Sequence, residues 1–241
     1  MTDRPSVLVP IRVLESESLP EGTPEILANA HVVLLGYHVI PDQTAPGQAR
    51  MQFEERATRR LEEFEQALTD AGVTLEHRLV FTHDAQQTIH RQIREANSLA
   101  VLVPNVIGDL EDVLVAVRGT VGLDRLARLV VGLFAETDVG VTLFHVTSED
   151  ETDADVGMLL DGLVDRLVEA GFESDRIRTR TARDDKPVAA IAELAETHDA
   201  VVMGESDPSL STFVFGMPAD QVADRFLGPV LIVQREPTEE E

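Results

Sequence analysis

Few side chains in this 241-residue sequence have the type and spacing that a catalytic or metal site requires. The chain has no cysteine, so thiolate nucleophiles, disulfides and cysteine-ligated metals are excluded. His83, His90 and His198 lack the spacing of a metal-ligating motif, and Ser148 lies outside any Gly-x-Ser-x-Gly turn. We therefore expect neither nucleophilic catalysis nor a metal site.

Two arginines are better placed for binding. Arg12 and Arg118 directly follow the apolar runs at residues 7–11 and 113–117, so each is expected where a buried strand ends. A guanidinium there could hold a phosphate or carboxylate through two parallel hydrogen bonds. It could equally pair with an acid of this chain, such as Asp207. Both alternatives remain open, and we favour the ion pair.

Short apolar runs alternate with amphipathic segments along the chain, which predicts strands separated by helices. Most runs are continuous, as in strands buried on both faces, so we expect a parallel sheet covered by helices. Segments 48–70 and 155–170 each carry an apolar stripe and are followed by Ala-Gly, which predicts two long helices. The expected strands are residues 7–11, 32–39, 75–81, 99–103, 113–117, 141–146, 177–181, 200–203 and 230–233.

The two halves of the chain match at an offset of about 106 residues, which indicates an internal repeat. VLVPIR at 7–12 matches VLVAVR at 113–118, and His38-Val39 matches His145-Val146. We expect one unit at 1–110, a second at 111–236 and an acidic tail at 237–241. Because only residues 104–111 follow its fourth strand, unit one is expected to lack its last helix and strand.

The charge balance excludes several classes of partner. The chain has 20 basic and 44 acidic residues, a net charge of −24, which disfavours binding to nucleic acid and to anionic membrane surfaces. It has no apolar run long enough to span a bilayer and does not begin like a signal peptide, so we expect a cytoplasmic protein. Lys186 is the only lysine. This acidity favours a halophilic protein, since molar salt screens the repulsion.

These features resemble the universal stress protein family, in the tandem, acidic form that haloarchaea carry alone or appended to transporters. The resemblance is carried by VLVAV at 113–117, LFHV at 143–146, VVMG at 201–204 and GPVLIV at 228–233. It implies an α/β fold of two tandem open parallel sheets, similar to adenine nucleotide alpha hydrolases, with the first domain truncated. Ligands of such sheets bind beyond the carboxyl ends of the strands.

The family's nucleotide-binding members carry Gly-x-x-Gly, nine further residues and Gly-Ser or Gly-Thr, whose main chain approaches phosphates. Met203-Gly204 and Gly216 match this pattern, but Asp207 replaces the second glycine, Met217-Pro218 follows Gly216, and the spacing is one residue short. A carboxylate repels phosphate by about 1 kcal/mol or more at contact. The segment is therefore either an ordinary strand-to-helix loop or an altered ligand loop.

The resemblance implies candidate ligand-binding residues at the strand ends and in this loop, and at the Arg12 and Arg118 positions the family usually has aspartate. It also implies a structural role for His38 and His145. The candidates are Val117, Arg118, Val146, Met203, Gly204, Gly216 and Met217.

We expect a non-catalytic stress-response or regulatory protein that uses no cofactor and binds a small anionic effector. One alternative is a protein that binds ATP, AMP or another nucleotide, with weak ATPase activity. Another is a soluble regulatory domain of an amino-acid or cation transporter. Residues 230–233 are expected at a sheet edge, where they would form a homodimer as in dimeric relatives.

Overall fold

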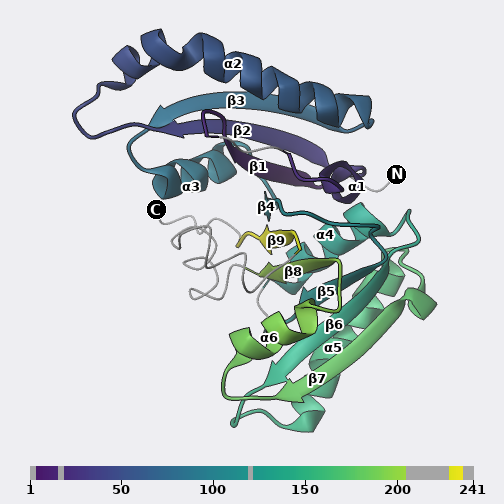
Figure 1. Cartoon of the computed structure of the whole chain (residues 1–241). Helices are drawn as coiled ribbons and strands as arrows, with labels where there is room; N and C mark the ends of the chain where they lie inside the picture. The colour runs from purple at the N-terminus through teal and green to yellow at the C-terminus, as the bar shows by residue number, and fades with distance from the viewer. Residues whose placement is uncertain (1–3, 16–18, 119–121, 205–227, 236–241) are drawn as a thin grey trace.

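The computed structural model describes residues 4–15, 19–118, 122–204 and 228–235. Within them the strands form one nine-stranded sheet in the order β3-β2-β1-β4-β9-β8-β5-β6-β7 (Figure 1). Every predicted strand is present, because each apolar run is long enough to be buried in the sheet. The strands are β1 (Ser6–Arg12), β2 (His31–Val39), β3 (Thr74–Thr82), β4 (Ala100–Val103), β5 (Asp112–Ala116), β6 (Gly140–Thr147), β7 (Ile177–Arg183), β8 (Ala200–Gly204) and β9 (Val230–Val233).

The two predicted units have the same strand order and meet at a single antiparallel pair. The first contributes β3-β2-β1-β4 and the second β7-β6-β5-β8, with β9 between β8 and β4. All neighbouring strands are parallel except β4 and β9. The strands of the two units therefore run in opposite directions. As a result, the carboxyl ends of β1 and β5 point in opposite directions.

The prediction that residues 230–233 form a sheet edge is wrong. Val230 pairs with Val201 of β8 on one side and with Val103 of β4 on the other. A homodimer through this strand would have to displace β4, so the predicted dimer has no free surface here. The sequence indicated that unit one lacks a fifth strand, but not that its fourth strand pairs with β9. The outer strands of the sheet are β3 and β7.

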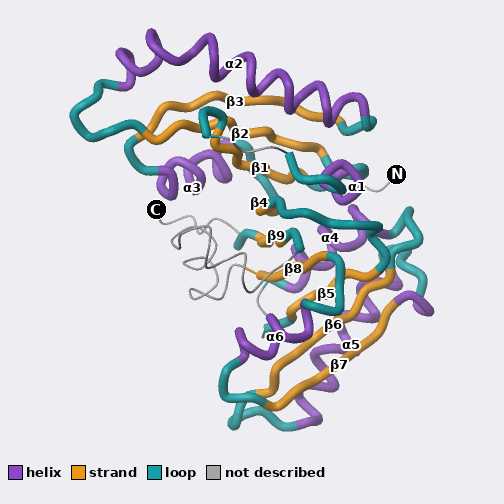
Figure 2. Tube along the Cα trace, in the orientation of Figure 1, coloured by secondary structure: helices purple, strands orange, loops and turns teal. Residues whose placement is uncertain are grey.

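Helices cover both faces of the sheet (Figure 2). The largest buried cluster packs α1 (Thr23–Leu27), α2 (Pro46–Asp70), α4 (Leu123–Phe134) and α5 (Asp153–Glu169) against one face. On the other face, α3 (Ala85–Glu95) packs on the first unit and α6 (Pro187–Ala195) on the second. The two long helices predicted at 48–70 and 155–170 are α2 and α5.

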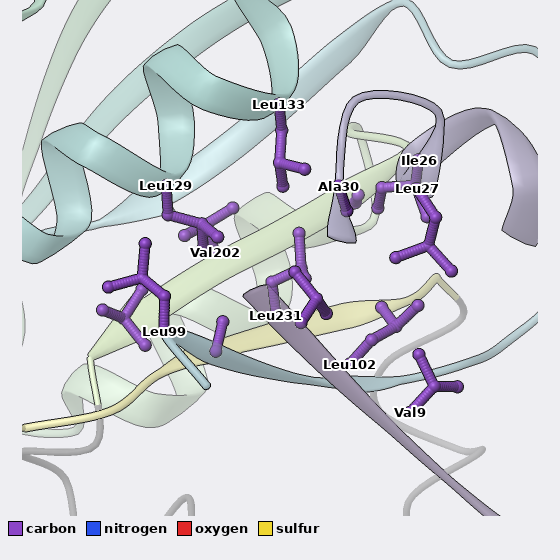
Figure 3. Packing of buried hydrophobic residues seen from close by; sticks show 14 of the residues in the cluster. Val9, Ile26, Leu27, Ala30, Leu99, Leu102, Leu129, Leu133, Val202 and Leu231 are labelled. Carbon is purple, nitrogen blue, oxygen red and sulfur yellow. The ribbon is translucent and has the colours of Figure 1, made fainter. Parts of the chain in front are cut away.

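One hydrophobic core crosses the boundary between the units (Figure 3). Side chains of the α1 region and of α4 meet over β4 and β9 there. Asn29 reinforces this contact, because its side-chain amide donates to the Leu133 carbonyl at 3.0 Å. The two units therefore share a core as well as a sheet. The residues that meet are Ile26, Leu27, Ala30, Leu102, Leu129, Leu133, Val202 and Leu231.

Candidate functional site

The carboxyl ends of β5 and β8 lie side by side in the second unit, where Ala116 pairs with Met203. The chain leaves β5 towards β6 on one side, whereas β8 lies on the other side. Such a switch point is where open α/β sheets bind ligands. The fold therefore brings the main chain of Val117, Met203 and Gly204 to one edge, with Val146 near the end of the adjacent β6.

The side chains of these residues do not form one surface. Val117 packs in the cluster beneath α4 and α5, whereas Val146 and Met203 pack in the cluster beneath α6. All three are buried. Their side chains therefore stabilise the sheet, and only their main chain is placed to contact a ligand at this edge. Gly216 and Met217, like Asp207, lie outside the described residues.

The two candidate arginines occupy different surroundings. Arg12 donates through Nε to the Tyr37 hydroxyl at 3.0 Å and through Nη1 to Glu15 Oε2 at 3.1 Å. The Tyr37 hydrogen bond, followed by the smaller contribution of Glu15, raises the pKa of Arg12 above its usual value. For Arg12 the structure thus shows the ion-pair alternative, with Glu15 as partner. Arg118 lies two residues beyond Ala116, the last residue of β5, and it is exposed at the switch-point edge.

His145 on β6 is a buried polar group next to this edge, and its contacts agree with the structural role that the resemblance implies. Its Nδ1 lies 2.9 Å from the Val117 carbonyl oxygen and its Nε2 lies 3.1 Å from Glu151 Oε2. Glu151 Oε2 also accepts from the Ser148 main-chain N–H at 2.8 Å and the Ser148 hydroxyl at 2.9 Å. These bonds, led by the main-chain one, lower the pKa of Glu151 to about 2.

Sequence reasoning missed Glu151. The available signal was a glutamate three residues after a serine in a loop between a strand and a helix, a spacing that lets the carboxylate bond back to the main chain. The next residue, Thr152, begins α5 with a capping box that it forms with Asp155. The loop before α5 is therefore fixed at both of its ends.

His38 is not in the position of His145, although the sequence repeat aligns them. The matching residues Val7 and Val113 pair with Val32 and Val141 on the neighbouring strands. His38 lies six residues after Val32, whereas His145 lies only four residues after Val141. His38 instead packs edge-on against the rings of Phe53 and Phe81. Its role is also structural, but its contacts are aromatic.

The sequence profile of the universal stress protein family matches residues 110–234, just over half of the chain. The chain belongs to this family. A universal stress protein from Archaeoglobus fulgidus DSM 4304 has a similar structure, with TM-score 0.63 and 17% identity over 98% of this chain and 97% of that one. A functionally unknown protein from Pseudomonas aeruginosa PAO1 gives TM-score 0.54 and 15% identity over 98% and 94%. Among curated proteins no sequence matches.

These likenesses show the fold along nearly the whole chain, whereas the family match covers the second unit. In the described part of the chain, no three histidine or acidic side chains are grouped so that they could hold a metal ion. Among the same residues, no helix is both long and apolar enough to cross a bilayer.

Proposed function

We propose that this universal stress protein is a non-catalytic stress-response or regulatory protein that binds a small anionic ligand where β5 and β8 end. The observation that carries this proposal is the position of Arg118. It lies two residues beyond the end of β5 at the switch point, and it is an exposed residue close in sequence to Ala116, which pairs with Met203. A guanidinium holds a phosphate or carboxylate through two hydrogen bonds.

The polar groups near this edge support binding rather than catalysis. The Ser148 hydroxyl and His145 Nε2 both contact Glu151 Oε2, so the carboxylate lies between the serine and the histidine. A serine nucleophile needs the histidine as its direct base. Nδ1 of His145 faces the Val117 carbonyl, a main-chain group that only accepts. Both side chains therefore act as structural partners of the loop.

Calorimetry with ATP, AMP and a cyclic dinucleotide at molar KCl tests the proposal, since a Debye length of about 3 Å at 1 M screens the repulsion between like charges. We expect at least one anion to bind to the wild type. The Arg118→Ala variant should lose at least about tenfold in affinity, because it lacks the bidentate contact, with its melting temperature nearly unchanged.

Arg12→Ala is the matched control, because Arg12 holds the corresponding position in the sequence repeat and is the last residue of β1, whose carboxyl end points away from that of β5. It should bind like the wild type and lose about 1–2 kcal/mol of stability, because it removes an exposed ion pair with Glu15 and the hydrogen bond to Tyr37. A lowered melting temperature in Arg118→Ala with no change in anion affinity would contradict the proposal. So would ATP turnover by the wild type.

A further inference from the structure

His145 faces two hydrogen-bond acceptors at once. It is 2% exposed, and its Nδ1 and Nε2 lie 2.9 Å from the Val117 carbonyl and 3.1 Å from Glu151 Oε2. A neutral imidazole carries one N–H, whereas the protonated ring carries two. Only the doubly protonated ring can therefore donate to both oxygens.

Glu151 cannot donate a proton to the nitrogen that lacks one in a neutral His145 ring. The Ser148 main-chain N–H, then the bond from His145 and that from the Ser148 hydroxyl, lower the pKa of Glu151 to about 2. Its carboxylate is therefore ionised throughout the pH range in which histidines titrate, about pH 5 to 8.

Several other charged groups on the elements around His145 have partners of their own, whereas Arg180, next to the Thr181 that pairs with His145 on β7, is exposed. On β7 and at the start of α5, Arg183 pairs with Asp153. Asp155 is held by Thr152 in the capping box of α5. On α4, Asp124 pairs with Arg166 of α5. Beyond the end of β5, Arg118 lies one residue after Val117, whose carbonyl contacts the ring. Glu151 is thus the carboxylate that bonds to the ring.

We infer that His145 is a positioning residue for the anion site. Its doubly protonated ring ties the main chain of Val117, one residue before Arg118, to the loop at 148–151. The link to anion affinity rests on the proposed function, whereas the tie itself does not. When the ring loses a proton, one of its two hydrogen bonds is lost, and the strand end is no longer tied to the loop. Anion affinity then falls as the pH rises.

The first unit offers an internal comparison. Arg12 is held directly by Tyr37 and Glu15, and His38 packs against phenylalanine rings. Among the described residues, the two-sided contact of a histidine ring with a carbonyl and a carboxylate therefore belongs to the second unit. We expect the pH dependence to follow His145 and not His38.

The first test is calorimetric titration with a cyclic dinucleotide at molar KCl, across about pH 5 to 8. The phosphodiester groups of the dinucleotide keep their charge over this range, so any change of affinity with pH comes from the protein. We expect wild-type affinity to fall at least about fivefold with rising pH as one bond of the tie is lost. His145→Asn should give a flat profile, because its amide can replace Nδ1 but does not titrate. His38→Asn should keep the wild-type profile.

The second test is NMR of the wild-type histidine rings and main-chain amides without ligand, so it depends neither on anion binding nor on the folding of a variant. We expect the Ser148 amide resonance to shift with the same midpoint as the His145 ring. If neither the dinucleotide nor ATP nor AMP binds at any pH, the proposed function fails, and the NMR measurement still shows whether His145 ties the strand end to the loop. A Ser148 amide resonance that does not shift as the His145 ring is protonated would overturn the inference. A wild-type affinity that is independent of pH would also overturn it.

Discussion

Arg176 joins the segment at 134–139 to the turn before β7 through one guanidinium. Nη1 donates to the carbonyls of Phe134, Thr137 and Val139, and Nη2 donates to that of Ala135. The same group stacks on the Phe172 ring, 4.4 Å from its centroid. The last carbonyls of a helix have no partner within it, so Arg176 satisfies groups that the end of α4 leaves open.

We predict that Arg176→Lys lowers the free energy of unfolding by about 1–3 kcal/mol, because an ammonium group cannot reproduce the planar fork that reaches four carbonyls. Arg178→Lys is the matched control, since Arg178 is exposed and forms one ion pair with Asp112. It should cost no more than about 1 kcal/mol. Urea denaturation at molar KCl measures both, and equal losses would show that the fork geometry is unimportant.

At the residue scale, the sequence predicted where Arg118 lies but not which contacts matter most. The position of an arginine after an apolar run follows from local pattern. The partners of Arg176 lie about 40 residues away in sequence and are main-chain atoms, which carry no sequence signal. For the same reason, the contact between His145 and the Val117 carbonyl could not be predicted from the sequence.

At the scale of elements, strands and long helices were predictable because continuous apolar runs and apolar stripes are local signals. The short helix α1 was not predicted, since five residues give too little periodicity. The pairing of β4 with β9 was also missed. It joins segments more than a hundred residues apart, and an apolar run does not specify which strand it will pair with.

Gly22, at the start of α1, packs against Ile107 in the segment between β4 and β5, which joins the two units. It has φ +80°, and a Cβ there would overlap the Ile107 side chain. Gly72, after α2, has φ +86° with nothing within 4 Å of a Cβ. Both Gly→Ala variants should therefore cost about 1–2 kcal/mol for the left-handed backbone. Gly22→Ala should lose a further ~1–3 kcal/mol through crowding. Denaturant unfolding distinguishes them, and equal losses would mean that the Ile107 contact adjusts freely.

At the scale of the whole molecule, the shared sheet and core have a consequence for unfolding. Leu102 of β4 and Leu231 of β9 are fully buried, and they lie between α1 of one unit and α4 of the other. Unfolding either unit alone would expose this apolar surface and the unpaired edge of β4 or β9. Because apolar exposure costs about 25 cal/mol per Å², separate unfolding of the units is unfavourable.

We therefore predict one cooperative transition. Tyr37 is the only tyrosine and the chain has no tryptophan, so tyrosine fluorescence reports the first unit, whereas circular dichroism reports both. Leu163→Ala, at a buried position of α5 in the second unit, should cost about 2–5 kcal/mol. It should lower the denaturant midpoint of the Tyr37 signal as much as that of the dichroism. Met158→Ala, at an exposed position on the same helix, should move neither. A Tyr37 midpoint that stays in place in Leu163→Ala would show that the first unit folds independently, despite its shared strand pair and core.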